Sequence, residues 1–119
     1  MKDKEFEYDF FNFRSTPLYK ELKDQLTPPK NVSVHPIGDH ISDFLRDGKG
    51  FYESHTFLQF YKDLPKKGTI LDIGANIGNH QMMFNQVYPN RRVIGFEASP
   101  YNFTHLYNNC LKYPFFKRR

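Results

Sequence analysis

The sequence predicts an α/β protein in which a Rossmann-like parallel sheet follows a helical N-terminal extension. An apolar run at residues 69–73 leads into a glycine-bounded turn and a helical stretch, and a second apolar run at residues 92–96 leads into another helical stretch. This strand–helix–strand–helix order implies adjacent parallel strands joined by a right-handed crossover. The chain is therefore divided into an N-terminal extension, residues 1–37, and a partial Rossmann-like domain, residues 38–119.

The extension begins with a charged and aromatic segment, residues 1–15, whose partial alternation is typical of a short edge strand or of a strap laid over the body. A helix is expected next, with Ser15 or Thr16 as its N-cap and Pro17 in its first turn. Pro28 and its neighbours end this helix. Its apolar side is formed by Leu18, Leu22 and Leu26.

Two short helices are expected before the first strand. Asp39 is suited to cap the first of them, and Gly48 ends it. The second covers residues 53–64, and residues 65–68 form the turn into the strand. The apolar positions are Ile41, Phe44 and Leu45 in the first helix and Phe57, Leu58, Tyr61 and Leu64 in the second.

A helix is also expected after each strand. The first covers residues 79–87 and is broken at residues 88–90. The second is capped by Ser99 and has Pro100 at its first position. The apolar positions are Met82, Met83, Phe84 and Val87 in the former helix and Phe103, Leu106, Tyr107, Cys110 and Leu111 in the latter.

Charge and composition exclude several classes of protein. The formal net charge is +4 and the pI is about 9.2, but Lys117, Arg118 and Arg119 carry three of the positive charges, so a nucleic-acid partner is not expected. No apolar run approaches the roughly 18 residues of a membrane span, and the first residues lack the apolar core of a signal peptide. The single cysteine, Cys110, cannot form an internal disulfide and is consistent with a reducing compartment, so a cytoplasmic location is expected.

The turn after the first strand predicts a cofactor site. Gly74 and Gly78 bracket the turn, and glycine lets a ligand approach the main chain without a Cβ in the way. The N-terminus of the following helix favours an anionic group. Asp72 is suited to bind an ammonium group, directly or through water, and Asn76 offers both a donor and an acceptor.

A second acid, Glu97, ends the second apolar run. An ionised carboxylate can accept hydrogen bonds from two neighbouring hydroxyls and therefore fits a ribose diol. The two acids and the glycine turn together point to S-adenosylmethionine, whose methionine end carries an ammonium and a carboxylate and whose ribose has a free diol. A nicotinamide dehydrogenase is disfavoured, because the dinucleotide fingerprint needs glycines where this chain has Asn76 and Asn79, and no P-loop lysine follows the turn.

The stretch Leu71–His80, together with Phe96-Glu97-Ala98-Ser99-Pro100 and Asn109, resembles the FkbM-type family of S-adenosylmethionine-dependent methyltransferases. That family typically reads D-x-G-A-N-x-G, then F-E-P-S-P, then an Asn late in the following helix. The resemblance covers roughly residues 38–112, and Ala98 stands where proline is usual. It implies a class I methyltransferase fold of which only the first strand–helix units are present. The cofactor-binding residues that it implies are Asp72, Gly74, Asn76 and Gly78 around the methionine end, Glu97 at the ribose hydroxyls, and Phe96 and Ala98 beside the adenine. Ala75, within the glycine turn, belongs to the same cofactor-binding set.

By this resemblance the expected activity is O-methylation of a sugar or another small metabolite, with no catalytic residue identified. Because residues 114–119 leave no room for a third strand followed by a helix, the chain is expected to be an N-terminal portion. Two alternatives stay open: an inactive, truncated or degenerate fragment, and a cofactor-binding subunit completed by another chain. A homo-oligomer is also left open. No metal site is expected from the histidine spacing, and His80 and Asn109 are expected to have structural roles.

Overall fold

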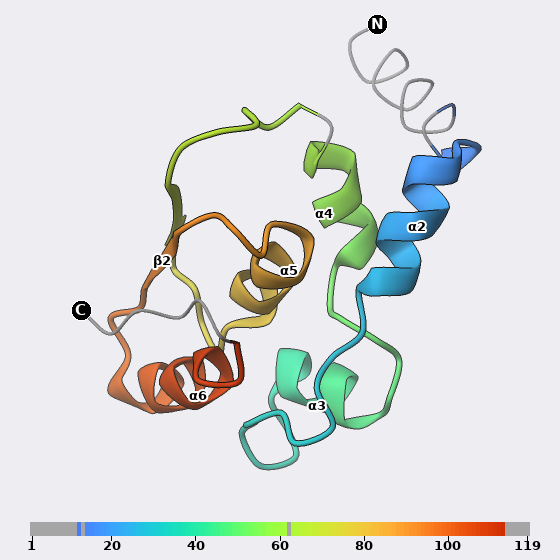
Figure 1. The fold of residues 1–119 in the computed structure, drawn as a ribbon. Coiled ribbons are helices and arrows are strands. Elements are labelled where there is room, and N and C mark those ends of the chain that lie inside the picture. Colours follow the sequence, from blue (N-terminus) through green and yellow to red (C-terminus); the bar gives the residue numbers. More distant parts are fainter. Residues whose placement is uncertain (1–11, 13, 62, 114–119) are drawn as a thin grey trace, which may run out of the picture.

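The computed structural model describes residue 12, residues 14–61 and residues 63–113. In chain order the elements are the helices α2 (Pro17–Gln25), α3 (His40–Arg46) and α4 (Ser54–Tyr61), the strand β1 (Ile70–Ile73), the helix α5 (Asn79–Val87), the strand β2 (Val93–Phe96) and the helix α6 (Pro100–Cys110) (Figure 1). The two strands are parallel, with Ile70 opposite Val93 and Ile73 opposite Phe96. The described residues thus form a mixed helix–strand fold with a small parallel sheet, in agreement with the predicted α/β class.

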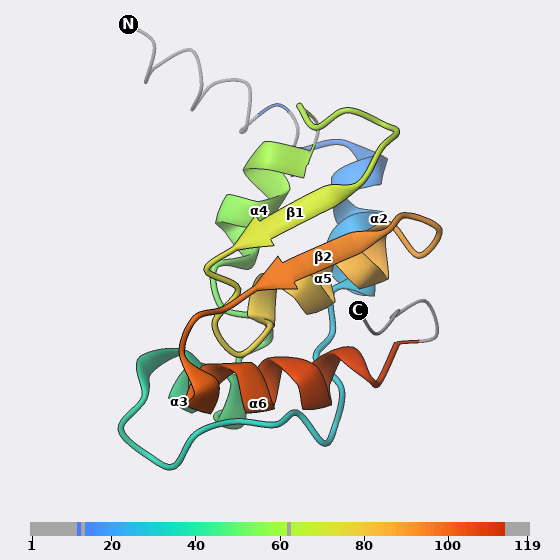
Figure 2. The ribbon, with the colours of Figure 1, turned by 90° about the vertical axis from the view of Figure 1, so that its left-hand side faces the viewer.

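One face of the sheet is covered by helices. Figure 2 shows β1 and β2 in front of α4, α5 and α2, with α6 and α3 below them. The helices α2, α4 and α5 contact one another in pairs, and α5 also contacts β2 and α6. Residues 17–26 of the predicted N-terminal extension therefore share one core with the helix that follows the first strand. This core includes Tyr19, Leu22, Leu26, Phe57, Leu58, Met82 and Met83.

The other face of the sheet is open in the described part of the chain. Leu71, Ile73 and Phe96 point to this side and are 58%, 80% and 50% exposed. Gly95 belongs to the covered side, where a Cβ would lie only 2.7 Å from Oε1 of Gln81, so the absence of a side chain lets α5 approach β2. The strands of a parallel sheet are usually buried on both faces. The open face is therefore an apolar surface without a partner among the described residues.

The predicted N-caps of three helices are confirmed. Side-chain oxygens of Thr16, Asp39 and Ser99 accept hydrogen bonds from the backbone amide three residues further on, at 3.2, 3.0 and 3.4 Å. Thr16, rather than Ser15, caps α2. Each bond satisfies one of the amides that a helix start leaves without an intrahelical acceptor. No helix in the described ranges is long and apolar enough to cross a membrane.

Three positions of the predicted apolar stripes are exposed, namely Leu18, Phe103 and Leu111. In α2 the buried side runs through Tyr19, because the helix turns residues 19, 22 and 26 toward α4 and α5. The expected strand or strap at the N-terminus falls almost entirely on residues 1–11, which lie outside the described residues. Residues 114–119 lie outside them as well.

Candidate functional site

The turn between β1 and α5 meets the end of β2 at the same edge of the sheet. Glu97 Oε1 accepts a hydrogen bond from the Asn76 backbone amide at 2.7 Å, and Oε2 accepts one from the Ser99 backbone amide at 3.0 Å. The side-chain amide of Asn102 donates to Oε2 from 3.5 Å. The glycine turn and Glu97, which the sequence analysis assigns to one cofactor site, therefore lie together at this edge.

These donors also set the charge state of Glu97. The backbone hydrogen bond from Ser99, helped by those from Asn76 and Asn102, holds the pKa of this carboxyl below its ordinary value, although burial opposes the shift. An ionised carboxylate has about four lone-pair sites. Three are occupied by described residues, and the contact with Asn102 is long. One site on Oε1 therefore remains free and a second is only loosely held, which suits a ligand with two hydroxyl donors.

The turn itself is fastened to β2. The backbone amides of Gly74 and Ala75 both donate to the Phe96 carbonyl oxygen at 2.9 Å. Gly74 has a φ of 75° and Asn76 a φ of 56°, in the left-handed region that glycine and asparagine tolerate best. A Cβ at Gly74 would meet no described atom within 4 Å, so the main chain is open to a ligand there.

Two side-chain oxygens, one in β1 and one in the turn, have no hydrogen-bond partner in the part of the chain that the structure describes. They are Asp72 Oδ2 and Asn76 Oδ1, and both are buried. Burial raises the pKa of Asp72, while the charge of His80 acts in the opposite direction. A buried acceptor without a donor costs about 1–3 kcal/mol. A group that brings several N–H donors and a positive charge, such as an ammonium, is the ligand chemistry that these two acceptors favour.

Two members of the predicted cofactor-binding set lie in the interior of the fold. Ala75 is 4% exposed and packs with Leu106 and Cys110. A Cβ at Gly78 would lie 3.1 Å from Leu106 Cδ1, and the φ of Gly78 is 97°. Gly78 thus lets α6 approach the start of α5. Contact of these two residues with a cofactor stays a prediction. In the structure, their packing against α6 shapes the turn.

The two residues predicted to flank an adenine lie at the end of β2 and just beyond it. Phe96 is half exposed and stands opposite Ile73 in the sheet register. Ala98 is exposed in the turn that leads to α6. An exposed aromatic ring beside Glu97 offers an apolar surface on which a planar base can stack.

A pocket of about 390 Å³ opens beside β1, where α4 and α5 face the strand. Asp72, His80 and Thr56 are its polar members. Nε2 of His80 lies 3.9 Å from Oε1 of Glu53, which precedes α4. The half-buried carboxylate of Asp72 therefore lies in a mainly apolar pocket. The apolar members of its lining are Phe57, Phe60, Leu64, Leu71, Ile73 and Phe84.

Two buried asparagines, Asn79 and Asn109, support the turn by hydrogen bonds to the backbone of neighbouring segments. Asn79 exchanges two hydrogen bonds with the backbone of Tyr52, at 2.9 and 2.7 Å. Asn109, which is fully buried, donates to the carbonyl oxygens of Ile77 and Ser33 at 2.7 and 2.9 Å and accepts from the Ser33 amide at 2.6 Å. The structural role predicted for Asn109 is confirmed. No such support was predicted for Asn79, although an amide beside a glycine turn and next to a helix start is a recognisable signal.

No group of three or more His, Cys, Asp or Glu side chains that could hold a metal ion occurs within the described ranges. No protein-family model matches the chain, and neither a curated protein nor a solved structure matches it.

Proposed function

We propose that this protein binds S-adenosylmethionine at the turn between β1 and α5, and that it belongs to a class I methyltransferase acting on hydroxyl groups of sugars or other small metabolites. The observation that supports this best is the 2.7 Å hydrogen bond between Glu97 and the Asn76 amide, because it joins the second acid to the glycine turn. A ligand that reaches one of them is close to the other.

The available groups match the two ends of this cofactor. Asp72 and Asn76 offer unpartnered oxygens to an ammonium group, and Glu97 offers its remaining lone pairs to a ribose diol. Phe96 offers an exposed ring to the adenine. When bound, S-adenosylmethionine supplies a methyl group on a positively charged sulfur. The contribution of this chain is to bind and orient, because the turn and Glu97 are already fastened together.

Isothermal titration of the full chain with S-adenosylmethionine, its demethylated product and adenosine tests the proposal. Saturable binding of all three is expected, because adenosine carries the same ribose diol and adenine. Asp72→Asn is expected to weaken the first two by about tenfold, since about 1.4 kcal/mol of charge-assisted hydrogen bonding is lost. It should leave adenosine binding unchanged, because adenosine has no ammonium group.

The matched control is Asp24→Asn, which neutralises an exposed carboxyl on α2 and should bind like the unaltered protein. Absence of binding by both S-adenosylmethionine and its product would contradict the proposed function. An equal loss of adenosine binding in Asp72→Asn would place Asp72 away from the methionine end.

A second candidate function, a cofactor-binding subunit whose sheet is completed by another chain, is favoured by the open face of the sheet. Leu71, Ile73 and Phe96 are at least half exposed there. Light scattering after size exclusion should then show an assembly larger than a monomer, and Ile73→Lys should dissociate it, whereas Ile37→Lys at another exposed isoleucine should not. If the protein is a monomer at all concentrations, its sheet is not completed by a second copy of the same chain.

A further inference from the structure

A chain of polar contacts leads from the segment before α3 to the candidate site. Nε2 of His35 lies 2.6 Å from Oδ1 of Asn102, and Nδ2 of Asn102 lies 3.5 Å from Oε2 of Glu97. We propose that His35 and Asn102 are positioning residues that orient the Glu97 carboxylate. The consequence for ligand binding rests on the proposed function. The contacts that link His35, Asn102 and Glu97, here named the relay, can be measured without a ligand.

The partners of Asn102 fix the direction of its side-chain amide. An ionised carboxylate only accepts hydrogen bonds, so the NH₂ group of Asn102 must face Glu97. Its carbonyl oxygen then faces His35, and Nε2 of His35 must carry a hydrogen. Each group in the relay therefore has one defined donor or acceptor role. If His35 is removed, the amide loses the partner that holds it in this orientation.

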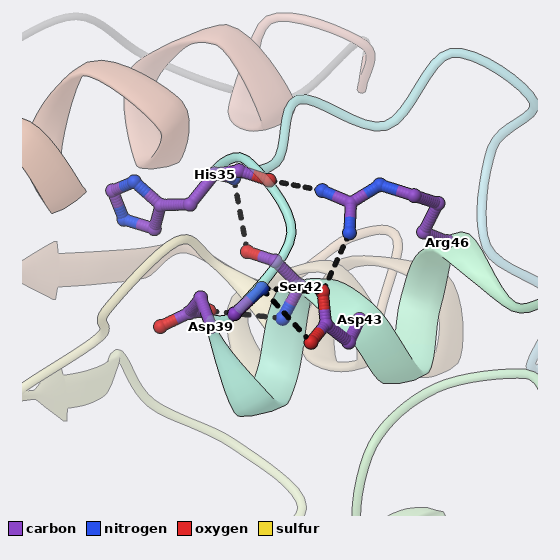
Figure 3. Close-up of polar contacts among 6 residues, drawn as sticks. His35, Asp39, Ser42, Asp43 and Arg46 are labelled. Carbon is purple, nitrogen blue, oxygen red and sulfur yellow. Dashed lines mark hydrogen bonds and ion pairs between the residues drawn. The ribbon is translucent and has the colours of Figure 1, made fainter.

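His35 is itself anchored by α3, as Figure 3 shows. Its backbone amide donates to Oγ of Ser42 at 3.0 Å, and its carbonyl oxygen accepts from the guanidinium of Arg46. Arg46 also bonds Asp43 at 2.6 Å. The imidazole points away from these contacts, so α3 holds the backbone while the ring is left to reach Asn102 on α6.

The ring of His35 also packs against a second imidazole. His105 of α6 meets it edge to face, with ring centroids 4.4 Å apart. Nδ1 of His105 is in turn 2.6 Å from Oγ of Ser33. The ring of His35 is therefore held between its own anchored backbone and a second imidazole, which limits its rotation away from Asn102.

The long contact of Asn102 with Glu97 suits a positioning role. At 3.5 Å the amide is near the limit of a hydrogen bond, so it restrains the carboxylate without filling that lone pair firmly. A ligand hydroxyl can displace it at small cost. The bonds from Asn76 and Ser99 hold the carboxylate to the turn, and Asn102 restrains its remaining freedom to rotate before the ligand binds.

The relay is tested by measuring the pKa of Glu97 in the ligand-free full chain, from the pH dependence of its ¹³Cδ resonance. Asn102→Ala and His35→Ala are expected to raise this pKa, Asn102→Ala by about half a unit, since a bond to the ionised form is lost or loosened. His35→Gln keeps an N–H donor and is expected to restore the original value. The control is His55→Ala, which removes an exposed imidazole on α4 that bonds Tyr19 rather than Asn102.

The tautomer of His35 provides a test that needs no variant. ¹⁵N chemical shifts should show a hydrogen on Nε2 at neutral pH, and a bare Nε2 would overturn the relay. An unchanged Glu97 pKa in Asn102→Ala would overturn it as well. If the pKa values move as expected but S-adenosylmethionine does not bind, the relay stands and the proposed function fails.

Discussion

Glu97→Gln is expected to weaken the binding of S-adenosylmethionine by about 10- to 100-fold. The glutamine amide has one acceptor oxygen, so its NH₂ group must face a backbone amide donor, that of either Asn76 or Ser99. Hydrogen bonds to a charged acceptor contribute about 1.5–3 kcal/mol, and about 1.4 kcal/mol corresponds to a tenfold change in affinity. Isothermal titration measures the loss. Adenosine should lose affinity too, because it carries the same ribose diol.

The control for this variant is Glu21→Gln, which removes an exposed carboxyl from α2 and is expected to bind normally. Asp72→Asn and Glu97→Gln should therefore differ in their response to adenosine, which only the second variant impairs. If Glu97→Gln binds S-adenosylmethionine as tightly as the unaltered protein, Glu97 does not contact the ribose and the proposed site is wrong.

The charge of Glu97 also has a defined pH dependence. Because its pKa is lower in the folded chain than in the unfolded one, its contribution to stability is fully present above the unfolded value, which is about 4.3. The contribution is lost as the pH falls through the lower, folded value. Between pH 5 and 8 the carboxylate remains ionised, so a change in affinity within that window has to come from another group.

Asn109→Ala is expected to have the largest effect on stability, lowering the free energy of unfolding by about 3 kcal/mol. The side chain is fully buried and bonds the amide and carbonyl of Ser33 and the carbonyl of Ile77. Alanine leaves these three backbone groups without partners, and each unsatisfied buried group costs about 1–3 kcal/mol, partly recovered where the structure relaxes or water enters. Urea denaturation followed by circular dichroism measures the change.

The neighbouring asparagine gives a matched control. Asn108 is exposed on the same helix, so Asn108→Ala changes the same kind of side chain at the adjacent position and should alter stability by no more than about 0.5 kcal/mol. Equal stability of the two variants would mean that Asn109 does not tie the segment at Ser33 to the turn at Ile77.

The strands and helices could be predicted because their signals are local. Thr16, Asp39 and Ser99 mark the helix starts within a few residues of the chain, and the expected helix at residues 79–87 has the bounds that are observed. The meeting of Glu97 with the turn was also predictable, because the carboxyl ends of neighbouring parallel strands lie at one edge of a sheet.

The contacts that support the site could not be predicted in the same way. Ser33 lies 76 residues from Asn109 and His35 lies 67 residues from Asn102, and no local pattern links such distant positions. Burial of Tyr19 in place of Leu18 depends on which side of α2 meets α4 and α5. Tertiary contacts decide these features, whereas periodicity alone only restricts the choice.

The sharing of one core by α2, α4 and α5 affects how the protein should be prepared. Tyr19, Leu22 and Leu26 share a core with Phe57 and Met83, although the motifs of the proposed cofactor site begin about fifty residues later. A shortened recombinant version that starts at residue 38 would keep every motif and still expose the apolar side of two helices. Recombinant versions that start upstream of Thr16 keep the N-cap of α2 and its core residues Tyr19, Leu22 and Leu26. They are therefore the suitable material for titration and spectroscopy.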